Sequence, residues 1–120
     1  MDMKEFYNAV GGDYTDVCER FMNEKIVGVF IEKFLQDSTF AEMADMLEHD
    51  NLPEAFRTAH TLKGICANLG FKNLADVSSE ITELLRSGDI ESAKKLFAKS
   101  KQEYYNVLDS IEKLRSAQKT

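Results

Sequence analysis

The sequence predicts an all-α protein, an up-and-down antiparallel four-helix bundle with one or two short extra helices at its N-terminal end. Nearly every segment with a readable hydrophobic period repeats at three to four residues, the spacing of helices that each bury one face. A chain of 120 residues that is 43% hydrophobic has the size of one domain with a continuous core. Short connections between such helices favour antiparallel neighbours.

The N-terminal third is expected to hold short helices. Residues 3–10 and 13–21 are predicted as two leading helices around Gly11 and Gly12, and an apolar helix follows them. Its expected core residues are Ile26, Val27, Phe30, Ile31, Phe34 and Leu35. Ser38 is placed to cap the next helix. We therefore expect a single domain over 1–120, with leading helices at 1–21 and a main bundle at 22–118.

Start and stop signals divide the rest of the chain into three helices. Asn51, Leu52 and Pro53 indicate a helix start, because proline is tolerated in a first turn, and Gly70 is a natural stop. The next periodic set ends at Gly88, after which Asp89 can cap a long final helix. The first two of these helices should form a hairpin.

The helix that starts near Asn51 has two distinct faces. Its core face is expected to hold Ala55, Ala59, Leu62, Ile65, Cys66 and Leu69. The opposite side holds Phe56, His60, Lys63, Gly64 and Ala67, so His60 should project away from the core. A solvent-facing imidazole is a competent nucleophile when neutral.

Two neighbours of His60 suggest a phosphoryl site. A glycine in mid-helix costs roughly 1 kcal/mol relative to alanine, so Gly64 calls for a reason such as the close approach of another molecule. Lys63 would supply a positive charge near a phosphoryl group on His60. Phe56, Ala67 and Phe71 would leave apolar surface around the histidine for a docking partner.

The run Ala59-His60-Thr61-Leu62-Lys63-Gly64, followed by Ala67-Asn68-Leu69-Gly70 and Leu74, resembles the histidine phosphotransfer (HPt) family of two-component phosphorelays. The resemblance implies a four-helix bundle in which His60 is phosphorylated and Lys63 and Gly64 support the phosphate side. Two positions depart from the family pattern. Ile65 stands where alanine or serine is usual, and Thr82 stands where some members carry a glutamine that hydrogen-bonds the imidazole.

The resemblance also implies the partners. His60 would exchange a phosphoryl group with aspartates on receiver domains of response regulators or hybrid histidine kinases, or accept it directly from a histidine kinase. The receiver would hold the Mg²⁺, so no metal and no cofactor is assigned to this chain. We do not expect an enzyme, because no Gly-rich nucleotide-binding segment occurs, although the family can be classed with phosphotransferases or kinases.

Composition and charge indicate which partners and which compartment to expect for this chain. The net charge of −6 disfavours nucleic acid as a partner. No stretch is apolar enough to span a membrane and no secretory signal is apparent, so we expect a cytoplasmic monomer with free thiols at Cys18 and Cys66. His49 lacks comparable neighbours and receives no role. The alternative function is a non-catalytic helical adaptor that binds partner proteins without phosphotransfer.

Overall fold

The computed structural model describes residues 1–118 of the chain. Within that range the secondary structure is α-helical without strands, which confirms the all-α prediction. The helices are α1 (Met3–Ala9), α2 (Tyr14–Phe21), α3 (Glu24–Phe34), α4 (Thr39–Glu48), α5 (Leu52–Leu69), α6 (Lys72–Arg86) and α7 (Ile90–Gln118). None of these helices combines the length and the apolar character needed to cross a lipid bilayer.

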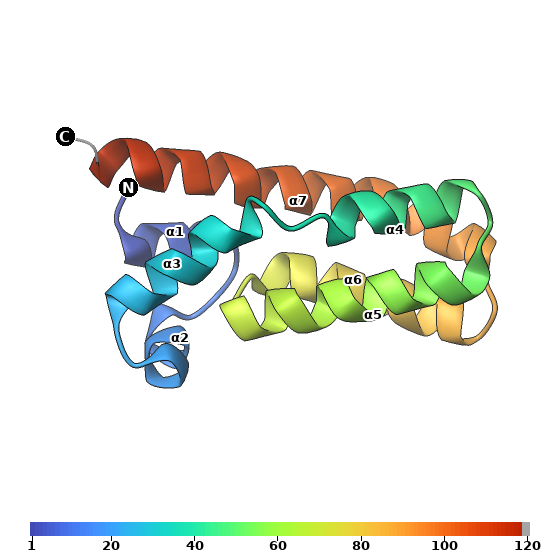
Figure 1. Ribbon diagram of the computed structural model, residues 1–120, viewed down its shortest axis with the longest axis horizontal. Helices are drawn as coiled ribbons and strands as arrows, with labels where there is room; N and C mark the ends of the chain where they lie inside the picture. The colour runs from blue at the N-terminus through green and yellow to red at the C-terminus, as the bar shows by residue number, and fades with distance from the viewer. Residues whose placement is uncertain (119–120) are drawn as a thin grey trace.

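Helices α4 to α7 form the antiparallel bundle. Each packs against the next along the chain, and α7 returns to contact α4. Figure 1 shows α7 running along the length of the molecule, with α3 and α4 following one another beside it and α1 to α3 gathered near its C-terminal end. Helices α1 and α2 are the two short leading helices that the sequence predicts, and α3 lies with them at that end of the bundle.

The break between α3 and α4 lies where the sequence predicts the start of a new helix. The amide of Leu35 bonds to the carbonyl of Glu32, and the two following amides repeat this tighter i to i−3 pattern, which closes the helix. Asp37 then accepts a hydrogen bond from the backbone N–H of Thr39 at 2.8 Å. The prediction that the Ser38 side chain caps α4 is wrong, because Asp37 bonds to the first turn in its place.

The predicted core of α3 is partly wrong. Val27, Ile31 and Phe34 are buried as expected. Ile26 is 39% exposed and Phe30 is 36% exposed. The apolar stripe of α3 is thus wider than the face that its neighbours bury.

One hydrophobic cluster includes buried residues from all seven helices in the described range. Phe71, at the turn between α5 and α6, packs edge-on against Phe6 at 5.8 Å and against Phe34 at 5.1 Å between ring centroids. Tyr7 donates its hydroxyl to the carbonyl of Leu69 at 2.8 Å. These contacts fix the C-terminal end of α5 against α1 and α3.

Candidate functional site

Helix α5, which carries His60, has well-defined ends. Asn51 accepts a hydrogen bond from the backbone N–H of Glu54 at 3.3 Å, and Pro53 lies in the first turn. At the other end Gly70 has φ +79°, and the amide of Phe71 bonds back to the carbonyl of Cys66. Both predicted boundary signals of this helix are confirmed, and they leave His60 near its middle.

The two faces of α5 separate as the helical wheel predicts. The buried face holds Ala55, Thr58, Ala59, Leu62, Cys66 and Leu69. Ile65 is half-buried at its edge. On the opposite side His60, Gly64 and Ala67 are exposed, while Phe56 and Lys63 are half-buried. The imidazole is therefore accessible to another protein.

The imidazole of His60 stacks on the phenyl ring of Phe56, with ring centroids 5.9 Å apart and planes inclined by 9°. Among residues 1–118, no side chain or backbone group hydrogen-bonds either ring nitrogen of His60. Thr82 is fully buried and donates its hydroxyl to the carbonyl of Ser78 at 2.7 Å. Thr82 thus does not take over the hydrogen bond that a glutamine makes in some HPt proteins.

Three cationic side chains lie on or beside this face. Lys63 follows His60 by one helical turn and forms no ion pair with any described residue. Arg57 precedes His60 by one turn and pairs with Glu54 at 2.5 Å. Arg86, from α6, lies over the ring of Phe56 with its guanidinium carbon 5.0 Å from the centroid. Arg86 also pairs with Glu83, so Lys63 is the one of these three cations that has no ion pair with a described residue.

Gly64 leaves open space beside His60. A Cβ atom placed on Gly64 would meet no heavy atom within 4 Å apart from its own helix backbone and chain neighbours. Packing inside this chain therefore does not require a glycine here. The helix therefore carries an energetic cost at this position that no packing contact of the described residues explains.

The prediction of Phe71 as a docking residue is wrong. Its side chain is completely buried among the aromatic rings of α1 and α3. Position 71 caps the start of α6, so its side chain turns into the core instead of continuing the outer face of α5. Ala67 is exposed and Phe56 is half-buried, so these two can contribute surface.

Sequence reasoning missed two features of this region. The first is Arg86, whose guanidinium lies over Phe56 of another helix, a contact that spacing within α6 does not indicate. The second feature is the outer side of α3, where Phe30 and Lys33 line a groove with Ile65 and Asn68 of α5. No periodicity signal distinguishes such exposed apolar residues from core.

The described chain also holds reactive groups other than His60. Exposed ligand atoms of Asp45, Glu48 and His49 at the end of α4 lie within 4.8 Å of one another, an arrangement that is common on acidic surfaces without a metal ion. Both cysteines are free thiols, as expected. Burial raises the pKa of the Cys66 thiol, which disfavours the reactive thiolate.

Comparison with known proteins identifies relatives of this chain. The family model described as "Hpt domain" matches residues 25–117, from the first turn of α3 to the end of α7. A chemotaxis protein CheA from Borreliella burgdorferi is 31% identical over 77 residues. That alignment covers 57% of this chain and 9% of the relative. The aligned segment thus spans less than a tenth of that protein's length.

Proposed function

Because this chain belongs to the Hpt domain family, we propose that His60 is the residue on which it carries a phosphoryl group. The family gives the general role, histidine phosphotransfer in phosphorelays by a carrier module that is not itself the catalyst. One observation supports the choice of residue above the others. His60 is exposed on α5, and Gly64 beside it leaves space that no part of the described chain fills.

In the phosphoryl-transfer step this chain needs to supply only a nucleophilic nitrogen and a nearby positive charge. A ring nitrogen of His60 attacks the phosphorus of a phosphorylated aspartate on the partner through its lone pair. The bond between phosphorus and the aspartate oxygen breaks, and its electron pair leaves with the carboxylate. The second ring nitrogen keeps its proton, so the step needs no general base from this chain. Lys63, which forms no ion pair with a described residue, attracts the transferred anion.

The partner supplies the rest of the chemistry. Phosphoryl transfer depends on positioning and on neutralising the charge of the transferring group. We assign the Mg²⁺ and the reacting aspartate to receiver domains of response regulators or hybrid histidine kinases. The chain itself acts as substrate and intermediate, and it operates in the cytoplasm as a monomer.

The docking surface extends from Phe56 and Ala67 to the outer side of α3. Asn68 follows His60 by eight residues, about 12 Å along the helix, and it shares a groove with Phe30. An interface of ordinary size, about 800 Å² on each partner, is wide enough to include both His60 and Phe30. We expect Phe30→Asp to slow transfer from a receiver domain without affecting phosphorylation by a small-molecule donor.

The first test is intact mass after incubation with a phosphoramidate donor. Wild type, His60→Gln and His49→Gln are compared, each with an acid-treated aliquot. His49 is the other histidine of the chain and is also exposed, so its variant controls for non-specific modification. We expect one acid-labile phosphoryl group on wild type and on His49→Gln, and none on His60→Gln.

The competing function is a helical adaptor. An adaptor would bind its partners equally well with glutamine at position 60 and would remain unmodified by the donor. A folded wild type that stays unmodified beside a working control would therefore favour the adaptor. Equal modification of wild type and His60→Gln would assign the phosphoryl group to another residue.

A further inference from the structure

The C-terminal end of α2 lies against the last turn of α5. The Nε of Arg20 donates to the backbone carbonyl of Asn68 at 3.0 Å. The phenyl ring of Phe21 contacts that of Phe30, with 4.9 Å between the centroids. Asn68 and Phe30 line the groove that the proposed docking surface includes. Helix α2 therefore borders this surface, although it precedes the residues that the family model matches.

We propose that Arg20 is a specificity-determining residue of the docking surface, and that its guanidinium pairs with a carboxylate on the receiver domain that docks against Phe30 and Asn68. The inference rests on the proposed function, because it takes a receiver domain as the partner that exchanges a phosphoryl group with His60. It concerns which receiver domain binds, and it leaves the chemistry at His60 unchanged.

The guanidinium of Arg20 is held at two of its nitrogens and available at the third. Its Nε bonds to Asn68, and its Nη1 bonds to Asp16 of the same helix at 3.0 Å. No described residue accepts a hydrogen bond from Nη2. The side chain of Arg20 is 35% exposed. An arginine that is already held in this way loses less conformational entropy when it binds a carboxylate.

Charged side chains surround the apolar contact at fixed positions. Lys33 lines the groove and lies over the ring of Phe30, 5.2 Å from its centroid. Arg20 borders the groove at Asn68, and Asp37 also lines it. A receiver domain that buries Phe30 has to match charges of both signs around it. Such a pattern discriminates among partners, because a like charge opposite any one of these groups is repelled.

A purely structural role would also account for the bond between Arg20 and Asn68, since a cation is favourable at the C-terminal end of a helix. The two roles differ in what they require of the side chain. The bond to the carbonyl needs only a donor. Pairing with a carboxylate on a receiver domain needs the positive charge, and salt weakens it. The salt dependence of transfer therefore separates the two roles.

The test is the rate at which the phosphorylated chain passes its phosphoryl group to a receiver domain. The full chain is phosphorylated with phosphoramidate, freed of the donor, and mixed with a receiver domain and Mg²⁺ at low and at high salt. The receiver domain is chosen from those of the source organism because it exchanges with wild type. Intact mass follows the loss of the phosphoryl group, and receiver concentrations well below saturation give kcat/KM.

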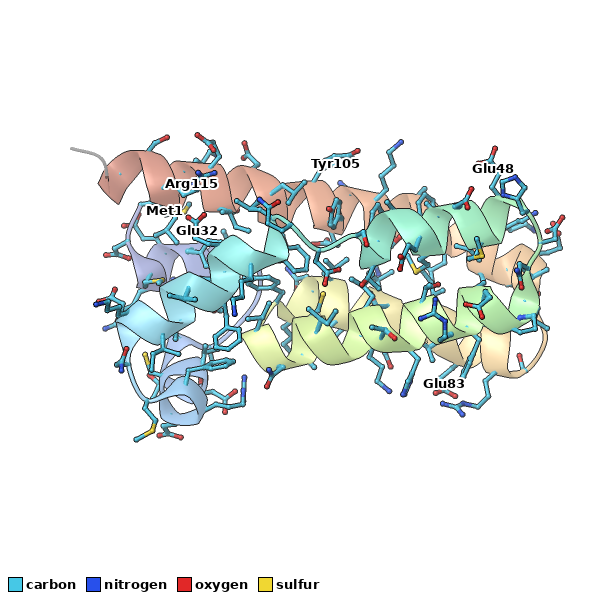
Figure 2. The ribbon with its side chains drawn as sticks, viewed as in Figure 1. Met1, Glu32, Glu48, Glu83, Tyr105 and Arg115 are labelled. Atoms are coloured by element: carbon cyan, nitrogen blue, oxygen red, sulfur yellow. The ribbon has the colours of Figure 1, made fainter. Side chains whose placement is uncertain are left out.

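Four variants are compared with wild type: Arg20→Gln, Arg20→Lys, Asp16→Asn and Arg115→Gln. Arg115 is a matched control, because it is 38% exposed and, like Arg20, pairs with an acid on its own helix and contacts another helix. Figure 2 shows Arg115 at the edge of the molecule that α7 forms, opposite the edge at which α2 lies. Circular dichroism verifies each fold, and the rate of labelling by phosphoramidate measures the reactivity of His60 in each variant.

We expect Arg20→Gln to lower kcat/KM about three- to fivefold at low salt, the effect of losing one exposed ion pair. The difference from wild type should shrink at high salt, where the pair is screened. Arg20→Lys should keep most of the rate, because the charge remains. Asp16→Asn should raise kcat/KM, because the carboxylate that competes for the guanidinium is gone, and Arg115→Gln should match wild type. Structural damage at the end of α5 would instead slow the Arg20 and Asp16 variants at every salt concentration.

The outcomes separate this inference from the proposed function. A kcat/KM that is the same in Arg20→Gln and wild type, or that falls equally at low and high salt, overturns the pairing of Arg20 and leaves the carrier function intact. A wild type that phosphoramidate labels on His60 but that exchanges with no receiver domain also overturns it. A folded wild type that takes up no phosphoryl group overturns both the inference and the proposed function.

Discussion

The phenyl ring of Phe56 and the imidazole of His60 lie parallel, one helical turn apart on α5, with 5.9 Å between their centroids. This contact orients the ring in a chain where no described residue hydrogen-bonds it. Thr82 is too short and too deeply buried to replace the glutamine of some relatives. Under the proposed function, stacking on Phe56 would take the place of a hydrogen bond in presenting the imidazole of His60.

Replacing Phe56 tests this orientation. Phe56→Leu keeps an apolar side chain on the helix but removes the stack, which is worth about 1 kcal/mol or roughly a fivefold change in rate. We expect the initial rate of phosphorylation by phosphoramidate to fall by about that factor, while the circular dichroism spectrum stays unchanged. Phe56→Tyr preserves the ring and should react at the wild-type rate. Equal rates for Phe56→Leu and wild type would show that the stack has no part in positioning His60.

Gly64→Ala separates the stability of α5 from its function. The new methyl group meets no atom within 4 Å outside the local helix, so the variant gains helix propensity without a clash. We expect the free energy of unfolding to rise by about 0.5–1 kcal/mol in urea denaturation. Transfer from a receiver domain should become at least several-fold slower, because the methyl group fills the space beside His60.

Gly28→Ala is the matched control for this experiment. Gly28 also lies in mid-helix, on α3, where a Cβ would make only an ordinary contact with Met3 at 4.0 Å. Gly28→Ala should raise the free energy of unfolding by a similar amount without changing the rate of transfer from a receiver domain. If Gly64→Ala transfers as fast as Gly28→Ala, the glycine is not there to admit a partner.

The sequence predicts best where a signal is local. Asn51 and Gly70 define the ends of α5 through bonds within one or two turns, so residue type alone locates them. Asp89 likewise accepts from the amide of Ser92 at 3.1 Å, as expected for the cap of α7. At Ser38 the prediction failed because two adjacent polar residues compete for the same amide groups, and the local sequence does not decide between them.

Features that depend on tertiary packing were harder to predict. Phe71 and Phe30 are chemically identical in the sequence, yet one is buried and the other lines a surface groove. Their difference depends on which helices lie opposite them, and periodicity does not encode that. Arg86 was missed for a related reason, since its contact is with a ring on another helix. By contrast, the outward direction of His60 follows from helical spacing alone.

Gly70→Ala should be strongly destabilising, because two costs coincide at this residue. Its φ of +79° is unfavourable for alanine by about 1–2 kcal/mol. A Cβ would also lie 2.3 Å from Val17 Cγ2 and 3.0 Å from Tyr7 Cε1, so the leading helices would have to move. Gly88 has a φ of +83°, and a Cβ there would meet no atom within 4 Å. Gly88→Ala therefore measures the conformational cost of the backbone without a clash.

We therefore expect Gly70→Ala to lose at least about 1 kcal/mol more than Gly88→Ala in urea denaturation. The excess measures how tightly α1 and α2 are held against the end of α5. Equal losses in the two variants would mean that these helices shift freely to admit the methyl group.

The stability contribution of His49 should depend on pH. The backbone carbonyl of Asp45, and then its carboxylate, raise the pKa of His49 above the usual 6.5. Because the folded chain binds this proton more tightly than the unfolded chain, the contribution is fully present below pH 6.5 and is lost as the pH rises through the raised pKa. The Tm of wild type should therefore exceed that of His49→Gln by more at about pH 5.5 than at about pH 9. Asp45→Asn should lower the His49 midpoint in a proton NMR titration, and a midpoint at or below 6.5 in wild type would contradict the proposed pairing.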